Sequence, residues 1–278
     1  LKEMPNVTVK NRSQVFGYYD HNMLVMSERV SDHLPNTEKY IPKQRLWYIR
    51  AKEVIISSGS IERPLVFGNN DTPGVMLSSA AKEYIKIYGV LVGKKPLIFT
   101  NNDSGYETAI EFKKNGIDPI ILDTRKNPSS DIITEAKNLS ITIKYSHVVV
   151  AAKGYKKVRS ADIAEISEDK KVLGKIENIS CDCICVSGFW TPTIHLASQS
   201  GNKTKFNESI DAFVPGISKQ NETTLGAANG IYTLDETLKS SFETGYKLSK
   251  KITNNENKVS FPNVVEKKST VHDKFWCV

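Results

Sequence analysis

The chain has 278 residues, of which 39% are hydrophobic and 25% are charged, and its 38 Lys and Arg outnumber 31 Asp and Glu to give a formal net charge of +7. A chain of this length forms about two domains, and this composition excludes collagen-like, fully disordered and membrane-spanning proteins. The lysines are scattered through Asn-rich stretches and are not interleaved with aromatic residues, so we predict no nucleic-acid partner and no membrane partner.

The cysteines and the N-terminus favour a cytoplasmic protein. Four cysteines are too few and too clustered for a disulfide framework, and residues 1–5 lack the basic and apolar pattern of a secretory signal. Cys181, Cys183 and Cys185 alternate along a predicted strand, so we expect all three on one buried face. Their spacing does not match that of zinc ligands, and we predict no metal site. The start at Leu1 indicates a fragment.

The first third of the chain is predicted to form short strands and one helix. Residues 54–60 differ from the other strands, because an apolar run there leads directly into small residues and Gly59. Apolar residues at helical spacing predict a helix over residues 78–88, with Gly89 as its C-cap. The expected strands lie at residues 7–9, 15–16, 24–26, 44–51 and 54–56, with a loop at 31–43.

A new unit is predicted to begin at Lys94. A strand at residues 96–100, a helix at 105–114 and a strand at 119–122 have the length of a βαβ unit with a parallel crossover. Another helix is followed by a strand, by three antiparallel strands with Lys-rich turns, and by a further strand and helix. These elements are expected at residues 131–138, 141–145, 148–152, 158–166, 172–177, 181–186 and 234–248.

The turn at residues 101–104 stands where dinucleotide folds bind a pyrophosphate at a helix N-terminus. Of the usual glycines only Gly105 is present, and Asp103 puts a negative charge in the place of the phosphate. Asp123 follows about 20 residues later, at the spacing of a ribose ligand. We interpret this unit as a nucleotide-binding architecture that no longer binds a nucleotide there.

Two further segments are candidates for ligand contact. Ser58 and Gly59 end an apolar strand, where glycine permits close backbone approach, and Arg63 offers a cation to an anion. A strand-to-loop corner with a structural arginine is an equal alternative. Gly226 and Gly230 precede a predicted helix and suit a phosphate or ring edge at its positive end, with a plain helix-entry turn as the alternative. We predict no catalytic residue, since no nucleophile or histidine pair is recognisable.

Seven motifs, in order and without large gaps from about residue 7 to about residue 248, resemble the alpha subunit of heterotetrameric sarcosine oxidase. Each motif is weak alone, and the ordered set is specific. The motifs are VFGYYDHN (15–22), QRLWYIRAK (44–52), SGSIERPLVF (58–67), NDTPGVML (70–77), FTNNDS (99–104), VSGFWTPTIHL (186–196) and GAANG (226–230).

The resemblance implies an α/β fold with two dinucleotide-binding (Rossmann-like) domains, similar to thioredoxin reductase. One domain is expected to be split between residues 1–93 and 184–250, with the second, at 94–183, inserted in it. Residues 251–278 would be a linker to a missing C-terminal domain. The N-terminal Gly-x-Gly-x-x-Gly fingerprint is missing from this sequence, so alone the chain is expected to bind NAD poorly or not at all.

The resemblance also implies an oxidoreductase acting on the CH–NH group of its donor. NAD is expected in this subunit, whereas FAD and FMN are expected in a beta subunit or at the interface with it. Small gamma- and delta-type subunits would complete the heterotetramer. Sarcosine, a small amine, would be demethylated to glycine in the partner, with hydrogen peroxide formed from oxygen and the one-carbon unit passed to tetrahydrofolate.

The matching motifs imply seven positions near the nucleotide, which are given at the end of this paragraph. Three alternative functions stay open. An alpha subunit of a dye-linked amine or proline dehydrogenase would share the scaffold. A stand-alone FAD-dependent pyridine nucleotide reductase would need a redox cysteine pair or a functional second fingerprint, and this chain supplies neither. An assembly scaffold would no longer bind nucleotide. The seven positions are Ser58, Gly59, Glu62, Arg63, Gly226, Asn229 and Gly230.

Overall fold

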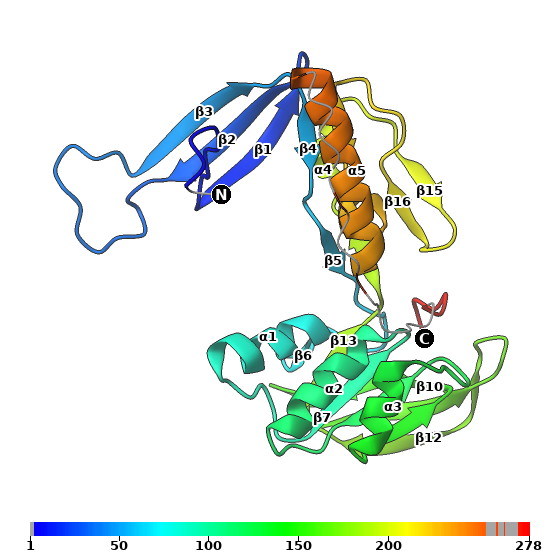
Figure 1. The fold of residues 1–278 in the computed structure, drawn as a ribbon. Coiled ribbons are helices and arrows are strands. Elements are labelled where there is room, and N and C mark those ends of the chain that lie inside the picture. The colour runs from blue at the N-terminus through cyan, green and yellow to red at the C-terminus, as the bar shows by residue number, and fades with distance from the viewer. Residues whose placement is uncertain (1–2, 254–259, 261–263, 265–271) are drawn as a thin grey trace. The chain divides into compact units, whose positions relative to one another are not determined.

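The chain divides into two compact units, each built from two stretches of sequence (Figure 1). Within the described part of the chain, no helix is long and apolar enough to cross a membrane. The computed structural model describes residues 3–253, 260, 264 and 272–278. The first unit comprises Leu1–Ser60 and Pro192–Val264, and the second comprises Ile61–Thr191 and Val265–Val278.

A three-stranded antiparallel sheet begins the first unit. Its strands, in spatial order, are β1 (Ser13–Tyr19), β2 (Met23–Arg29) and β3 (Gln44–Arg50). The turn between β1 and β2 uses positive φ angles, which its asparagine tolerates. The strand predicted at residues 7–9 is not formed, because β1 begins only at Ser13.

Two short parallel strands, β4 (Val54–Ile56) and β17 (Glu222–Thr224), lie side by side in the first unit. Val54 and Ile56 are buried in its core, together with residues of β1 and β2. Both strands point the same way and therefore end at the same edge, which positions the candidate site described below. The other elements are α4 (His195–Gln199), β15 (Lys205–Asn207), β16 (Ala212–Val214), the 3₁₀ helix η1 (Gly226–Asn229) and α5 (Leu234–Thr253).

Five parallel strands form the centre of the second unit, in the order β6-β13-β7-β8-β9. The two strands β7 and β13 are buried along their whole length, as apolar runs in a parallel sheet predict. Three helices pack on one face of this sheet. The elements are β6 (Val75–Leu77), α1 (Ser78–Tyr88), β7 (Pro96–Thr100), α2 (Ser104–Lys114), β8 (Ile120–Asp123), α3 (Asp131–Asn138), β9 (Thr142–Tyr145) and β13 (Cys183–Ser187).

An antiparallel sheet packs on the other face of the parallel sheet, and its three strands agree with the sequence prediction. They are β10 (His147–Lys153), β11 (Ser160–Ile166) and β12 (Val172–Ser180). Apolar side chains of both sheets form one buried cluster, which also contains Phe275 near the end of the chain. Two further strands, β5 (Ser60–Glu62) and β14 (Trp190–Pro192), pair where the chain passes between the units.

The boundaries of the units differ from the predicted ones. Because β6 and β13 hydrogen-bond within the sheet that contains β7, residues 61–93 and 184–191 belong to the second unit. The predicted linker at 251–278 begins as the last turn of α5, and residues 272–278 pack on the second unit. Most of the remaining linker lies outside the described residues.

The three clustered cysteines are all buried, as predicted, but they do not share one face. Cys183 and Cys185 lie among the helices, whereas Cys181 belongs to the cluster on the opposite side of the sheet. Since β13 begins at Cys183, its alternation does not extend back to Cys181. Burial raises the pKa of the Cys181 thiol to about 12, so this thiol stays protonated at neutral pH.

Candidate functional site

The carboxyl ends of β4 and β17 bring two predicted ligand segments together in the first unit. The amide of Leu225 donates to the carbonyl of Ile56 over 2.9 Å, so the parallel pairing continues to the last residue of β4. Ser58 therefore follows one strand while Gly226 follows its neighbour. Ligands of open α/β sheets bind at this edge, outside the carboxyl ends of the strands.

The loop after β4 is fixed by its neighbours but leaves one glycine open. The Ser58 hydroxyl donates to the carbonyl of Thr193 over 2.8 Å, and the Thr193 amide donates to the carbonyl of Gly59 over 2.9 Å. Gly59 has φ +74°, and a Cβ placed on it would meet no atom within 4 Å. The backbone is thus both held in place and accessible to a ligand.

The segment after β17 forms a single 3₁₀ turn, η1, which the sequence did not predict. Helix α5 begins at Leu234, as predicted, and Gly226 and Gly230 frame the separate turn that precedes it. Both glycines have positive φ, and the Ile231 amide donates to the Gly226 carbonyl over 3.1 Å. Asn229 is half-buried, and its side-chain amide has no hydrogen bond to another described residue.

Glu62 and Arg63 belong to the second unit and have structural contacts there. Glu62 is 4% exposed, and its Oε2 accepts a 2.8 Å bond from the Ser79 amide at the start of α1. Burial raises the pKa of this carboxyl, despite the hydrogen bond from Ser79. The Arg63 guanidinium carbon lies 3.8 Å from the Trp276 ring centroid, and Arg63 Nε donates to the Gly188 carbonyl over 3.3 Å.

The carboxyl edge of the second unit's parallel sheet contains a buried ion pair that sequence analysis missed. Arg125 donates to both carboxylate oxygens of Asp123, with Nη2 to Oδ2 at 2.8 Å, and its Nη1 reaches Asp103 at 2.8 Å. Tyr106 adds a 2.7 Å bond to Asp123. The arginine thus joins the residue at the ribose position to the residue at the phosphate position. Arg125 neutralises the charge of Asp103 within the protein. Sequence analysis had instead expected this charge to stand unmatched in the place of a phosphate.

Polar side chains also close the point where β7 and β13 diverge. Asn102 Nδ2 donates to the Ser187 carbonyl over 3.0 Å, and the Asn101 amide donates to the same carbonyl over 3.3 Å. Asn102 is 2% exposed and Asn101 is fully buried. The point at which a doubly wound sheet usually receives a ligand is therefore bridged by the chain's own amides.

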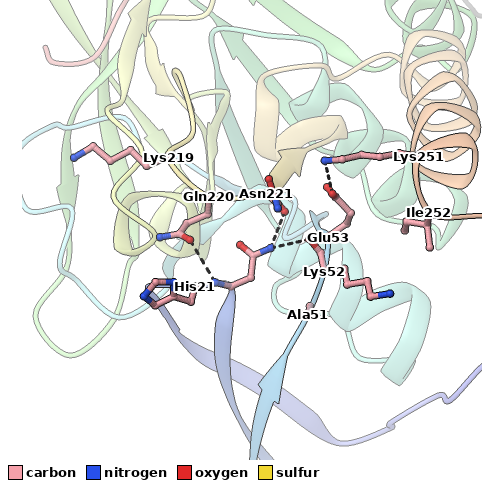
Figure 2. Close-up of a pocket in the computed structure, with 10 residues that line it drawn as sticks. His21, Ala51, Lys52, Glu53, Lys219, Gln220, Asn221, Lys251 and Ile252 are labelled. Atoms are coloured by element: carbon pink, nitrogen blue, oxygen red, sulfur yellow. Dashed lines mark hydrogen bonds and ion pairs between the residues drawn. The ribbon is translucent and has the colours of Figure 1, made fainter.

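A hollow of about 530 Å³ in the first unit lies at the opposite ends of β4 and β17, where these strands begin (Figure 2). Asn22 lines it and donates to the carbonyls of Lys52 and Asn221 over 3.2 and 3.1 Å. In Figure 2 the Lys52 and Lys219 chains extend to opposite sides, so their ammonium groups do not converge on one ligand. Lys251 forms an ion pair with Glu53. We assign this hollow no ligand.

The sequence of the chain is similar to part of curated sarcosine oxidase alpha subunits. It is 37% identical over 230 residues to the "Sarcosine oxidase subunit alpha" of Rhizobium meliloti (strain 1021), covering 82% of this chain and 22% of that protein. It is 32% identical over 248 residues to the same subunit of Corynebacterium sp. (strain P-1), covering 88% and 25%. The chain thus spans about a quarter of their length. The resemblance inferred from the motifs is confirmed, although no family model matches the chain.

Solved structures confirm the predicted fold. The chain matches L-proline dehydrogenase from P. horikoshii with a TM-score of 0.56 at 19% identity, covering 86% of this chain and 40% of that one. It matches T. acidophilum thioredoxin reductase with a TM-score of 0.52 at 17% identity, covering 68% and 62%. These matches, with the parallel sheet of the second unit, show an α/β fold of the Rossmann-like, thioredoxin-reductase-like type.

Proposed function

We propose that this chain is the nucleotide-binding part of the alpha subunit of a sarcosine oxidase, an oxidoreductase acting on the CH–NH group of its donor. The observation that carries the proposal is the 37% identity across 82% of the chain. The similarity is supported by the ordered motifs, two of which follow the ends of β4 and β17. A common fold alone would not justify an activity, because this fold serves many reactions.

In this proposal NAD lies at the carboxyl ends of β4 and β17. Gly59 presents its backbone to open space, and the Asn229 amide is available as a donor and an acceptor, so both fit a dinucleotide. Ser58, Gly226 and Gly230 shape the backbone around them. NAD supplies a nicotinamide that accepts hydride, while the residues of this chain bind and orient it. Glu62 and Arg63 belong to the second unit, and their position near the nucleotide stays a prediction from the matching motifs.

The substrate and flavins are proposed to belong to partner chains. Sarcosine would give up two electrons to a flavin in a beta subunit that carries FAD and FMN, and oxygen would take them up as hydrogen peroxide. The one-carbon unit would pass to tetrahydrofolate, leaving glycine. Small gamma- and delta-type subunits would complete the complex in the cytoplasm. The word "subunit" in the names of the relatives supports the existence of partners.

The alpha subunit of a dye-linked amine or proline dehydrogenase is the second candidate. The structural match to L-proline dehydrogenase favours it as far as the fold is concerned. The two candidates differ in substrate and in electron acceptor. We expect the complete complex to consume oxygen with sarcosine. Turnover with L-proline and a dye, without oxygen consumption, would favour the dehydrogenase.

The nucleotide proposal is tested on the full subunit, co-expressed with its partners, by measuring bound NAD after purification. Gly59→Ala places a methyl group on the exposed backbone and is expected to lower NAD retention about tenfold. Gly116→Ala is the matched control, since Gly116 has φ +77° and equally open surroundings. Both variants carry a similar conformational strain of about 1–2 kcal/mol. Equal NAD retention in the two variants would contradict the placement of NAD at Gly59, whereas nucleotide-free wild-type protein would favour an assembly scaffold.

A further inference from the structure

Residues 272–278 lie as a short peptide along the second unit. Asn101 binds their backbone through both its own carbonyl and its side-chain amide. The Asp273 amide donates to the Asn101 carbonyl over 2.9 Å. In return, Asn101 Nδ2 donates to the carbonyls of Asp273 at 2.9 Å and Phe275 at 3.1 Å. One fully buried asparagine therefore satisfies three backbone groups of a segment more than 170 residues away in sequence.

The carboxylate of this peptide is held by a residue that follows β8. Thr124 Oγ1 donates to Asp273 Oδ2 over 3.0 Å, and Lys170 forms an ion pair with the same oxygen. Asp273 is thus bound through its backbone by the residue after β7 and through its side chain by the residue after β8. Both contacts lie at the carboxyl edge of the parallel sheet.

The apolar end of the peptide fills the core and extends the unit's backbone pairing. Phe275 is 4% exposed and belongs to the main buried cluster. The Val66 amide donates to the Trp276 carbonyl over 2.8 Å, and the Val278 amide donates to the Val66 carbonyl over 3.1 Å. This is the geometry of a strand added to an exposed backbone edge. The Trp276 ring covers the Arg63 guanidinium.

The position of this peptide is the place where a doubly wound fold receives its dinucleotide. Asn101 and Thr124 immediately follow β7 and β8, and His272 stacks on Phe189, which follows β13, with ring centroids 4.1 Å apart. At the same edge, Arg125 forms ion pairs with Asp123, at the position of a ribose ligand, and with Asp103, at the position of the phosphate. The carboxyl edge is consequently occupied by the chain's own groups.

We propose that the carboxyl edge of the parallel sheet in the second unit is a peptide-binding groove whose ligand is residues 272–278 of the same chain, and that this segment excludes nucleotide from the second unit. The groove recognises an extended peptide through Asn101 and Val66 and anchors it by a buried phenylalanine. The inference goes beyond the proposed function and does not depend on NAD binding in the first unit.

Hydrogen exchange, measured by mass spectrometry on the full subunit, tests the groove. Asn101→Ala removes both side-chain bonds to the peptide, so exchange in residues 272–278 is expected to rise at least about tenfold. Asn115→Ala is the matched control, because its exposed amide bonds only within α2 and its neighbouring turn. Equal exchange of residues 272–278 in the two variants, or rapid exchange in the wild type, would overturn the proposal.

Two further readouts guard against a variant that is merely unstable. A synthetic peptide of residues 272–278 is expected to restore protection at Val66 in a Phe275→Ser variant of the subunit, whereas a scrambled peptide leaves it exchanging. Failure of the native peptide contradicts the groove. Saturating NAD is expected to leave exchange in residues 101–106 of the wild type unchanged. Protection there would contradict exclusion, whatever NAD does at Gly59.

Discussion

Parallel strands end at the carboxyl edge of each unit, but the residues at one edge leave it open whereas those at the other close it. At the ends of β4 and β17, Gly59 faces open space and the Asn229 amide has no partner among the described residues. At the ends of β7 and β8, Arg125 binds two carboxylates and Asn101 binds residues 272–278. A parallel sheet therefore provides a binding edge, but its side chains decide whether that edge receives a ligand or closes.

The largest expected effect on stability comes from removing the cation of the buried ion pair at the carboxyl edge of the second unit. Arg125→Met leaves the buried Asp123 and the half-buried Asp103 without the Arg125 cation, which is expected to lower the free energy of unfolding by about 3–5 kcal/mol. Lys126→Met is the neighbouring control, because its ion pair with Glu168 is exposed and contributes at most about 1 kcal/mol. Urea denaturation measures both. Similar losses in the two variants would show that the arginine does not hold the edge together.

Removing the apolar anchor of the closed edge is expected to have the next largest effect. Phe275→Ala empties a buried site and should destabilise the second unit by about 3 kcal/mol, near the lower end for buried phenylalanine. Phe206→Ala is the control, since Phe206 is 52% exposed and should cost less than about 1 kcal/mol. Thermal unfolding of both variants provides the comparison. An unchanged midpoint for Phe275→Ala would contradict a docked segment.

A charge at the open edge is expected to weaken nucleotide binding without affecting stability. Asn229→Asp places a negative charge beside the proposed dinucleotide, whose phosphates are also negative, so the Kd of the full subunit for NAD should rise about tenfold, or about 1.4 kcal/mol. Asn70→Asp makes the same change at an exposed position of the second unit and should leave the Kd unchanged. Calorimetric titration measures both constants. If both values match that of the wild type, NAD does not approach Asn229.

The smallest effect concerns Glu62 and pH. Because burial raises its pKa in the folded state, folding favours the protonated acid, and this contribution to stability is lost as pH rises from the unfolded pKa through the folded one. Glu62→Gln should therefore flatten the fall of unfolding free energy with pH just above the ordinary glutamate range. Denaturation at a series of pH values tests this. A steeper fall of unfolding free energy with pH in the variant would contradict a raised pKa of Glu62 in the folded state.

Local sequence signals predicted the regular elements well. Helix α1 ends at Gly89 in a left-handed conformation, as helical spacing followed by glycine indicated. The βαβ unit after Lys94 and the antiparallel strands β10 to β12 were also recognised, because hydrophobic periodicity and turn residues act over a few positions. The glycines after β4 and β17 predicted ligand segments, which stays a prediction, and the separate 3₁₀ turn was not foreseen.

Long-range contacts account for what sequence analysis did not predict. β13 joins the sheet of β7 from almost ninety residues further along the chain, so the unit boundaries could not be read from local patterns. Arg125 carried a usable signal, since an arginine two residues after an acidic strand end can fold back on it. The docking of Phe275 had no local signal beyond an apolar pair in a polar stretch, because its partners are distant in sequence.

The contact between Asn101 and Asp273 has a consequence for biosynthesis. A ribosome releases the strands of the second unit early, yet the residues that cap them emerge only after the intervening segment of the first unit has been made. At ordinary elongation rates this delay is on the order of ten seconds. During that interval the apolar site that Phe275 fills in the finished protein is uncovered on the nascent polypeptide.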